Sequence, residues 1–405
     1  MPKSTQPAPF DQDQLRAIAK KSTDWFAKHR RDLPWRKTRV AYRIWISESM
    51  LQQTQVATVI PYYERFLNRF PDIHSLASAH LDEVYQLWAG LGYYRRARQL
   101  HAAAVKVVES GQAPFPTDRD AIANLPGIGR YTANAIASFA YDQRFGIVEA
   151  NTQRLYARLT LCKDPLSQTS SQKKLWSFAE SIVAAWPLAS GQLNQALMEL
   201  GSQVCTPKNP ACHQCPLAGD CQAHRSGLTD KIPVAKPKKI ITELREIGLV
   251  VYDTQGRILL RRRQPSERWA GLWDFPRYDC TQSPSDEIST ASAETQFFEQ
   301  YGTRLKILHE CVSVRHSVTR YRILLRCFEA RIGGRVATKN SKGRATNDQF
   351  AWYEPEGLEN LAMSASGRKV ADWLLKHRQR GAKIESSTHG VEFLTTEVRR
   401  GTEGI

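Results

Sequence analysis

The chain has 405 residues, of which 41% are hydrophobic, and this length and composition favour two globular domains with ordinary cores. The net charge of +17 favours a polyanionic partner, with nucleic acid as the first candidate and a merely basic, well-solvated surface as the alternative. No apolar run is long enough to span a membrane and the N-terminus lacks a secretory pattern, so we expect a cytoplasmic, nucleoid-associated bacterial protein.

The N-terminal part of the chain shows helical patterns. Residues 1–11 are expected to be disordered, and a helix is predicted over Asp13 to Lys28. A second helical segment, Ala41 to Gln55, carries Glu48 among apolar residues. A buried carboxylate is costly unless it is paired or takes part in chemistry. Glu48 is therefore a candidate catalytic residue, with an exposed helix residue that binds nothing as the alternative.

A run rich in glycine, tyrosine and arginine follows between Leu87 and Arg98. These residue types suit a surface that touches DNA, and the adjacent tyrosines offer an aromatic wedge for unstacking bases. For Tyr93, in the middle of this run, an aromatic residue of the core is the alternative.

A hairpin between two helices is predicted at Leu125 to Ile136, because Pro126, Gly127 and Gly129 end one helix before the next begins. The backbone N–H groups at the start of the second helix are free to hold a phosphate. Such a hairpin grips DNA by its backbone and reads no sequence. An ordinary connection between helices is the alternative.

A second candidate carboxylate is Glu149, which follows the apolar run Phe145 to Val148 and precedes the polar residues Asn151 to Arg154. In this position its carboxylate can face DNA that the hairpin holds. Further helices are predicted between Trp176 and Gly201.

Four cysteines, Cys205, Cys212, Cys215 and Cys221, are separated by six, two and five residues. Thiolates at such short spacing can ligate one metal centre. Zinc and disulfides are the alternatives, but zinc sites usually show two CxxC-like pairs and this run has one. The other four cysteines have no disulfide-like spacing, which favours a reducing compartment.

Prolines and lysines over residues 227–241 predict a linker. It would join a helical domain at 12–226 to a second domain at 242–380, with a flexible tail at 381–405. In the second domain, strands are predicted over Glu246 to Tyr252, Ile258 to Arg261 and Tyr321 to Ala330.

Together these motifs resemble the helix-hairpin-helix, iron–sulfur DNA glycosylases, and Ser47 to Val56 is similar to the signature of the MutY-type adenine DNA glycosylases among them. The resemblance implies a mainly α N-terminal helix-hairpin-helix glycosylase domain with a [4Fe–4S] loop, followed by an α+β Nudix-like domain. It implies base excision repair by a monomer that removes adenine mispaired with 8-oxoguanine or guanine in double-stranded DNA, after flipping the adenine out of the helix.

The roles of individual residues follow from the same resemblance. Adenine leaves poorly as an anion, so Glu48 is expected to protonate it as a general acid, and Glu149 is expected to stabilise the oxocarbenium-like sugar. Tyr131 and Asn151 would position water and carboxylate. The expected binding residues are Trp35, Arg36 and Gln195 at the flipped base, Gln53 and Tyr93 near the lesion and the vacated stack, Gly127 and Gly129 at the DNA backbone, and Cys205, Cys212, Cys215 and Cys221 at the cluster.

The sequence departs from the family pattern at two neighbouring positions: Glu149 stands where the family has aspartate, and Ala150 where it has glycine. The extra methylene moves the carboxylate by roughly 1 Å or more, which matters for catalysis. A non-catalytic mismatch-binding protein is therefore one alternative function. A glycosylase/lyase like endonuclease III is the other, but it needs a lysine nucleophile where this chain has Tyr131.

The block from Trp269 to Arg277 resembles the Nudix-like domain of MutY proteins. Most metal-binding carboxylates of a Nudix hydrolase are missing between Ala293 and Gly302, so no hydrolysis is expected there. The resemblance implies recognition of 8-oxoguanine, where the family's Phe-Ser-His corresponds to Val318, Thr319 and Arg320. The Thr319 hydroxyl could bond the lesion, whereas the fixed cation of Arg320 suits phosphate; an ordinary strand edge in a basic domain is the alternative.

Overall fold

The computed structural model describes residues 10–234, 240–281, 290–318, 320–332 and 350–387, with side chains as far as residue 377. The chain forms two compact units, Met1–Lys239 and Ile240–Ile405, and each is described by itself. Within the described residues, no helix is both long and apolar enough to cross a membrane.

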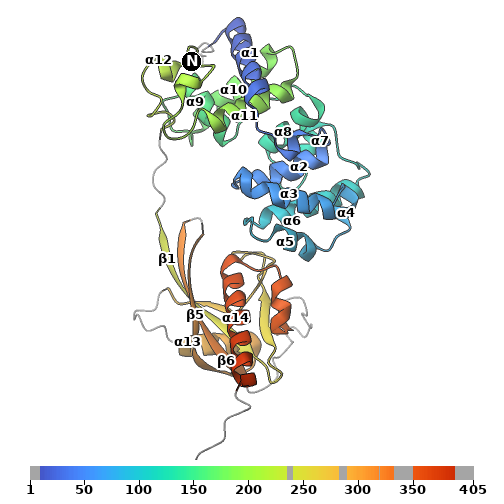
Figure 1. The fold of residues 1–405 in the computed structure, drawn as a ribbon, viewed down its shortest axis with the longest axis vertical. Coiled ribbons are helices and arrows are strands. Elements are labelled where there is room, and N and C mark those ends of the chain that lie inside the picture. Colours follow the sequence, from blue (N-terminus) through green and yellow to red (C-terminus); the bar gives the residue numbers. More distant parts are fainter. Residues whose placement is uncertain (1–9, 235–239, 282–289, 319, 333–349, 388–405) are drawn as a thin grey trace, which may run out of the picture. The chain divides into compact units, whose positions relative to one another are not determined.

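The first unit is helical (Figure 1). Helix α2 packs against α3, α6 and α8, whereas α1 packs on α10 and α11, and α11 also contacts α8 and α9. The elements are α1 (Gln12–His29), η1 (Pro34–Arg36), α2 (Ala41–Leu51), α3 (Val56–Arg69), α4 (Ile73–Ala77), α5 (Leu81–Trp88), α6 (Arg95–Glu109), α7 (Arg119–Ala123), α8 (Arg130–Tyr141), α9 (Ala150–Leu159), α10 (Thr169–Ala185), α11 (Ser190–Gln203), η2 (Cys212–Gln214) and α12 (Gln222–Arg225).

Residues 10 and 11 are described in the structure, although the sequence predicts disorder over residues 1–11. Asp11 caps α1: its side chain accepts a hydrogen bond from the Gln14 N–H, and the Gln14 side chain accepts one from the Asp11 N–H. Phe10 and Leu15 flank this capping box and are both buried, which fixes how the chain enters the helix. Residues 1–9 lie outside the described residues.

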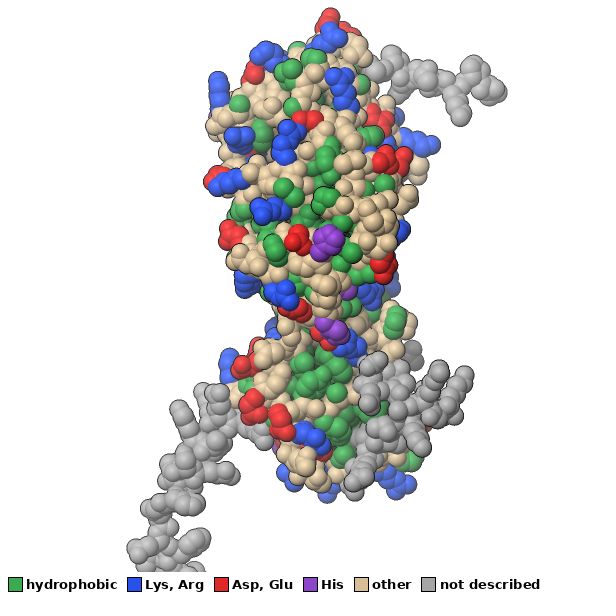
Figure 2. Space-filling view, turned by 90° about the vertical axis from the view of Figure 1, so that its right-hand side faces the viewer, with side chains coloured by type: hydrophobic (Ala, Val, Ile, Leu, Met, Phe, Trp, Pro, Cys, Tyr) green, Lys and Arg blue, Asp and Glu red, His purple; other side chains and the backbone are tan. Residues whose placement is uncertain are grey.

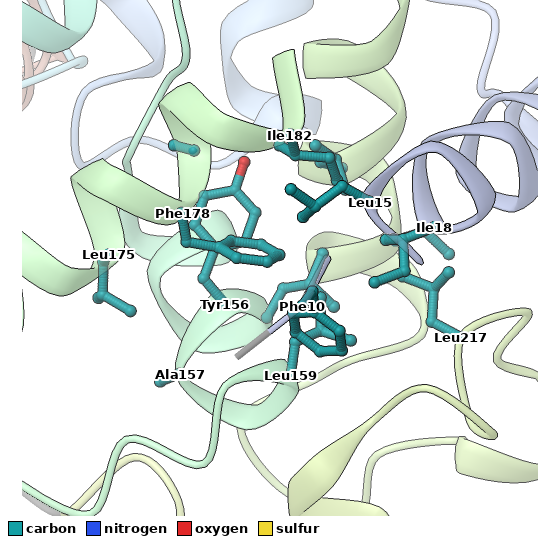
Figure 3. Close-up of a cluster of buried hydrophobic side chains, with 14 of the residues drawn as sticks. Phe10, Leu15, Ile18, Tyr156, Ala157, Leu159, Leu175, Phe178, Ile182 and Leu217 are labelled. Atoms are coloured by element: carbon teal, nitrogen blue, oxygen red, sulfur yellow. The ribbon is translucent and has the colours of Figure 1, made fainter. Parts of the chain in front are cut away.

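Figure 3 shows the core that Phe10 joins, with Leu15 near Ile182 and Ile18 near Leu217 of the cysteine-bearing loop. Tyr156 and Leu159 of α9 and Phe178 and Ile182 of α10 complete the contacts, and the rings of Phe10 and Phe178 lie 5.8 Å apart. The start of the predicted linker also belongs to this unit, because Ile232 is buried.

The second unit is a twisted sheet with a helix on each face (Figure 1). Along the sheet the strand order is β3-β2-β1-β6-β5, with β4 on β1 and β7 on β2; β1 and β6 are parallel and the other pairs are antiparallel. The elements are β1 (Thr242–Tyr252), β2 (Ile258–Arg262), β3 (Trp273–Asp274), β4 (Arg277–Asp279), α13 (Thr290–Tyr301), β5 (Leu305–Val318), β6 (Tyr321–Ile332), β7 (Phe350–Tyr353), η3 (Pro355–Asn360) and α14 (Ala365–Ser387).

Two apolar cores lie on the two faces of this sheet. Phe297 and Tyr301 of α13 pack on one face, and Val370 and Leu374 of α14 pack on the other. The three predicted strands are present as β1, β2 and β6. Helix α14 continues to Ser387, so the backbone of 381–387 is helical where a flexible tail was predicted; residues 388–405 lie outside the described part of the chain.

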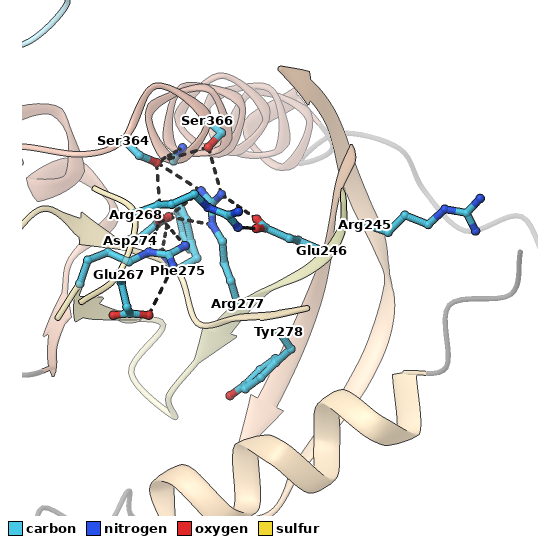
Figure 4. A network of polar contacts seen from close by, with 12 residues as sticks. Arg245, Glu246, Glu267, Arg268, Asp274, Phe275, Arg277, Tyr278, Ser364 and Ser366 are labelled. Atoms are coloured by element: carbon cyan, nitrogen blue, oxygen red, sulfur yellow. Dashed lines mark hydrogen bonds and ion pairs between the residues drawn. The ribbon is translucent and has the colours of Figure 1, made fainter. Parts of the chain in front are cut away.

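Buried charges are paired in this unit (Figure 4). Asp274 accepts hydrogen bonds from Arg263 Nε at 3.1 Å and Arg277 Nη2 at 2.7 Å, and Glu246 binds Arg268 and Arg277.

At the surface, Lys and Arg are scattered among Asp and Glu on the face shown in Figure 2. The excess positive charge is therefore spread over that face instead of forming one block.

Candidate active site

A cleft of about 930 Å³ opens in the helical unit. The end of α2, the segment after it, the beginnings of α8 and α9, and α11 supply its walls. Eight of the residues predicted from sequence line it together: Trp35, Arg36, Glu48, Gln53, Tyr131, Glu149, Asn151 and Gln195. Residues from five separate parts of the chain therefore meet at one cleft.

Glu48 is a buried acid with a tyrosine partner. Only 4% of Glu48 is exposed, and the Tyr131 hydroxyl donates a hydrogen bond to its Oε2 at 2.6 Å. Burial raises the pKa of Glu48 to about 7, and the nearby Glu149 carboxylate adds to the rise, whereas the Tyr131 hydrogen bond opposes it. A carboxyl group with this pKa is partly protonated at neutral pH and can donate a proton into the cleft.

Glu149 is the N-cap of α9. Its Oε2 accepts hydrogen bonds from the Asn151 N–H at 2.8 Å and Asn151 Nδ2 at 3.2 Å, and its Oε1 accepts one from the Thr152 N–H at 2.9 Å. Thr152 Oγ1 in turn accepts a bond from the Glu149 N–H, which completes a capping box. Burial raises the pKa of Glu149, but these three donors and the positive end of α9 favour the carboxylate form. The start of α9 therefore anchors the side chain of Glu149, which is longer than the aspartate of the family by one methylene.

Asn151 connects this carboxylate to the body of the domain. Its Oδ1 accepts a hydrogen bond from Arg154 Nη2 at 3.0 Å, and Arg154 also donates to the carbonyl oxygens of Gly201 and Cys205. A side chain at Gly201 would place its Cβ 2.6 Å from the Asn151 carbonyl oxygen, so glycine is needed for this approach of α11 to α9.

One wall of the cleft is an ion-pair network that the sequence reasoning did not include. Glu199 is 1% exposed, and both Arg31 and Arg36 bind it through paired hydrogen bonds of 2.7–3.1 Å. Burial alone would raise the pKa of Glu199, but these hydrogen bonds outweigh it and hold the pKa at about 2. The guanidinium of Arg36 is thus held by Glu199, and its contact with the base stays a prediction. The sequence signal for this network was Glu199 itself, a single carboxylate between the apolar Met198 and Leu200.

Gln53 and Tyr93 both have left-handed backbones, with φ of 59° and 51°. Gln53 lines the cleft, whereas Tyr93 does not. Tyr93 is 49% exposed, which rules out the alternative of a core aromatic.

The glycine hairpin separates α7 from α8, and Gly129 is the N-cap of α8. Gly127 has a φ of 77°, and a Cβ there would come within 2.6 Å of the Gln99 Cβ, so only glycine fits without a shift. A Cβ at Gly129 would meet open space, which leaves the N-terminus of α8 accessible to an anion. Arg130 lies over the Trp176 ring at 3.8 Å.

The four cysteines line a single small cavity beside α9. All four are free thiols, so the disulfide alternative does not hold. Arg158 Nη1 lies 3.2 Å from Cys205 Sγ, and its Nε donates to the carbonyl oxygens of Thr229 and Ile232. Burial raises the pKa of Cys215 to about 12. Four converging sulfur donors with a buried cation beside them fit an anionic iron–sulfur centre. No group of His, Cys, Asp or Glu in the described residues is spaced for a single metal ion.

In the second unit, Arg320 donates a hydrogen bond to the Tyr321 hydroxyl at 3.0 Å. Thr319 lies outside the described residues. Glu294 of α13 accepts a hydrogen bond from the Ile307 N–H, so this carboxylate anchors β5.

Three family models match the chain. They are the HhH-GPD superfamily base excision DNA repair proteins over residues 46–181, the iron–sulfur binding domain of endonuclease III over 205–221, and the NUDIX domain over 247–373. The second match spans all four cysteines, and the chain holds a [4Fe–4S] cluster.

Relatives that match more than half of the chain are adenine DNA glycosylases. The adenine DNA glycosylase of Buchnera aphidicola subsp. Schizaphis graminum is 40% identical over 62% of this chain and 71% of that protein. The adenine DNA glycosylases of rat and human are 40% and 39% identical over 69% and 65% of this chain, and the chain spans only 55% and 50% of their lengths. Among solved structures, a thermostable thymine-DNA glycosylase is 26% identical with a TM-score of 0.46, covering 53% of this chain and 98% of that one.

Proposed function

This chain belongs to the adenine DNA glycosylase family, and from that membership we propose that it is a monofunctional glycosylase for adenine mispaired with 8-oxoguanine or guanine. The observation that carries the proposal is the buried pair of Glu48 and Tyr131, which holds a proton at the wall of a cleft large enough for a flipped base. We further propose that the enzyme works as a monomer in the bacterial cytoplasm, at the nucleoid.

Glu48 acts as the general acid. Its carboxyl proton is transferred to adenine as the bond between the base nitrogen and the sugar C1′ breaks, so that the base leaves as a neutral molecule. The hydroxyl of Tyr131 donates to Glu48 Oε2, which fixes the orientation of the acid and stabilises the carboxylate that remains.

Glu149 stabilises the cation that develops on the sugar. Its carboxylate borders the same cleft, and its three hydrogen bonds hold it in one orientation before the charge appears. Water then attacks C1′, the sugar gains a hydroxyl group, and the proton of that water is released. Asn151 and Tyr131 position the carboxylate and the water.

DNA would be held through its backbone by the hairpin at Gly127 and Gly129, whose helix N-terminus accepts a phosphate. Gln53 and Tyr93 would fill the space that the flipped adenine vacates. Trp35, Arg36 and Gln195 border the cleft into which the base turns.

The cluster is assigned to Cys205, Cys212, Cys215 and Cys221, which surround the cavity beside α9. An iron–sulfur cluster supplies redox chemistry in many proteins, but nothing in the hydrolysis above requires it. Purified protein should contain about four irons per chain, as one four-cysteine cluster requires; a colourless, zinc-loaded and active protein would refute the assignment.

The second unit is proposed to read the 8-oxoguanine opposite the adenine, with Thr319 and Arg320 at the contact. We propose no phosphohydrolase activity for it, because α13 carries only Glu294 and Glu299 as carboxylates and Glu294 holds β5.

The deciding experiment is a glycosylase assay on a duplex with adenine opposite 8-oxoguanine, with guanine-paired and thymine-paired adenine as controls. Adenine release with strand cleavage only after added base or heat is the expected result, because Tyr131 offers no amine nucleophile. Efficient borohydride trapping of an enzyme–DNA adduct would instead support a lyase. Binding of the mismatch without base release would support the non-catalytic alternative.

A further inference from the structure

Arg96, in the first turn of α6, binds two separate segments of the backbone at once. Its Nη1 donates to the carbonyl oxygens of Ser49, Met50 and Gln52 at 2.9, 2.8 and 2.6 Å. Its Nη2 donates to the carbonyl oxygens of Leu91 and Gly92 at 3.3 and 3.1 Å. A sixth bond, of 3.2 Å, goes from Nη2 to the Thr54 hydroxyl.

The first of these segments is the end of the helix that carries Glu48. The last carbonyl groups of an α-helix have no N–H partner within the helix, and the helix dipole makes this end negative. The next residue along, Gln53, has a positive φ and lines the cleft. Arg96 therefore supplies both donors and a positive charge where α2 ends.

The second segment leads to Tyr93, the other non-glycine residue with a positive φ in this region. Trp88 Nε1 also donates to the Gly92 carbonyl, at 3.2 Å. The Arg96 guanidinium lies 5.3 Å from the Trp88 ring and 5.6 Å from the Tyr93 ring, so it makes cation–π contacts with both rings. Strained backbone persists only where its surroundings enforce it, and one guanidinium contacts the backbone beside both strained residues.

We propose that Arg96 is a positioning residue for base extrusion. It holds the backbone segment of Gln53 and the backbone segment of Tyr93 in a fixed arrangement, so that both side chains contact the duplex while adenine leaves the stack. This inference rests on the proposed glycosylase function. Arg96 acts through Gln53 and Tyr93 and takes no part in the bond cleavage that Glu48 and Glu149 carry out. Its loss should therefore slow excision only where the adenine must be unstacked and unpaired.

The test compares two duplexes under single-turnover conditions with saturating enzyme. One holds adenine opposite 8-oxoguanine, and the other holds adenine opposite an abasic-site analogue, where less pairing must be broken. For Arg96→Met we expect a loss of roughly 30-fold on the first duplex and of less than about 3-fold on the second, because extrusion is the step that depends on the two strained segments. Arg96→Lys keeps the charge but not the planar fork, so its loss should be intermediate.

Two further variants make the result specific. Tyr93→Ala should reproduce the selective loss, and Arg96→Met should add little in the Tyr93→Ala background, because the two residues act as one unit. Arg43→Met removes an exposed arginine from α2 itself and should leave both rates unchanged.

The positioning role would be overturned if Arg96→Met and Arg96→Lys each lost the excision rate equally on the two duplexes, including by misfolding. Wild-type excision rates of these variants on the two duplexes would also overturn it. Wild-type protein that releases adenine from neither duplex would mean instead that the proposed function is wrong.

Discussion

Both units bury carboxylates, and one carboxylate from each unit shows how much the bonded partners can differ. In the second unit Asp274 is fully buried, and Arg263 and Arg277 neutralise it. In the helical unit Glu48 is equally enclosed, yet its bonded partner is the neutral hydroxyl of Tyr131. A buried carboxylate with cationic partners is a structural ion pair, whereas one without them keeps its proton and can deliver it.

Glu199 shows that this difference belongs to the individual site and not to the domain. It lines the same cleft as Glu48, but two arginines hold its pKa at about 2 while the pKa of Glu48 is about 7. The partners of each carboxylate therefore decide which acid in the cleft can donate a proton.

The largest effect is expected for Glu48→Gln. The amide keeps the size of the side chain and can still bond Tyr131, but it has no acidic proton, so adenine release should fall by roughly 10⁴-fold, at the upper end for general acid catalysis. Affinity for the mispaired duplex and the melting temperature should be retained. A wild-type single-turnover rate would remove Glu48 from the mechanism.

Asp274→Ala tests the ion-paired carboxylate of the second unit. It leaves the buried guanidinium groups of Arg263 and Arg277 without their partner, and breaking such a pair costs about 3–5 kcal/mol. We expect the second unit to lose that much stability in denaturant unfolding, while adenine release by the helical unit retains the same chemical rate. If stability stays unchanged, the network in Figure 4 is not the structural ion pair described here.

Glu149 should tolerate shortening better than removal. Glu149→Ala removes both the negative charge near the sugar and the cap of α9, so excision should fall by about 10²-fold and stability by about 1 kcal/mol. Glu149→Asp restores a better N-cap residue and the carboxylate of the family, so substantial activity should remain. Undiminished rates in both variants would mean that another carboxylate stabilises the cation.

Separating the two units tests lesion reading. A cut near residue 228, at the start of the predicted linker, would remove Ile232, whose carbonyl oxygen binds Arg158 in the helical unit. Truncation after Lys239, at the boundary of the units, is therefore the cleaner design. The truncated protein should keep the chemical step but lose about 1–3 kcal/mol of preference for 8-oxoguanine over guanine, the size of one good base contact. Equal discrimination by the two forms would refute the lesion-reading role.

The sequence was sufficient for residues whose role depends on local spacing. The four cysteines, the hairpin glycines and the three strands β1, β2 and β6 were predictable because their signals lie within short runs. The Arg31–Glu199–Arg36 network and the four bonds from Arg96 to residues 49–54 were not, because they join residues far apart in the chain. The cap of α1 was a local signal that was overlooked: an acidic residue followed three positions later by glutamine.

The smallest effect, and the one that compares Glu48 with Glu199 most directly, is the pH dependence. In the proposed mechanism excision needs the protonated form of Glu48, so the single-turnover rate should fall about tenfold between pH 6 and pH 8, around the pKa of about 7. Glu199 stays ionised throughout this range and contributes no slope. The folded-state pKa of Glu48 lies above its unfolded value of 4.5, so the stability linked to its proton is complete below pH 4.5 and is lost as the pH rises through about 7. Glu48→Gln should therefore unfold with a weaker dependence on pH between 5 and 8 than wild type, and parallel stability curves for the two proteins would show that Glu48 does not titrate in this range.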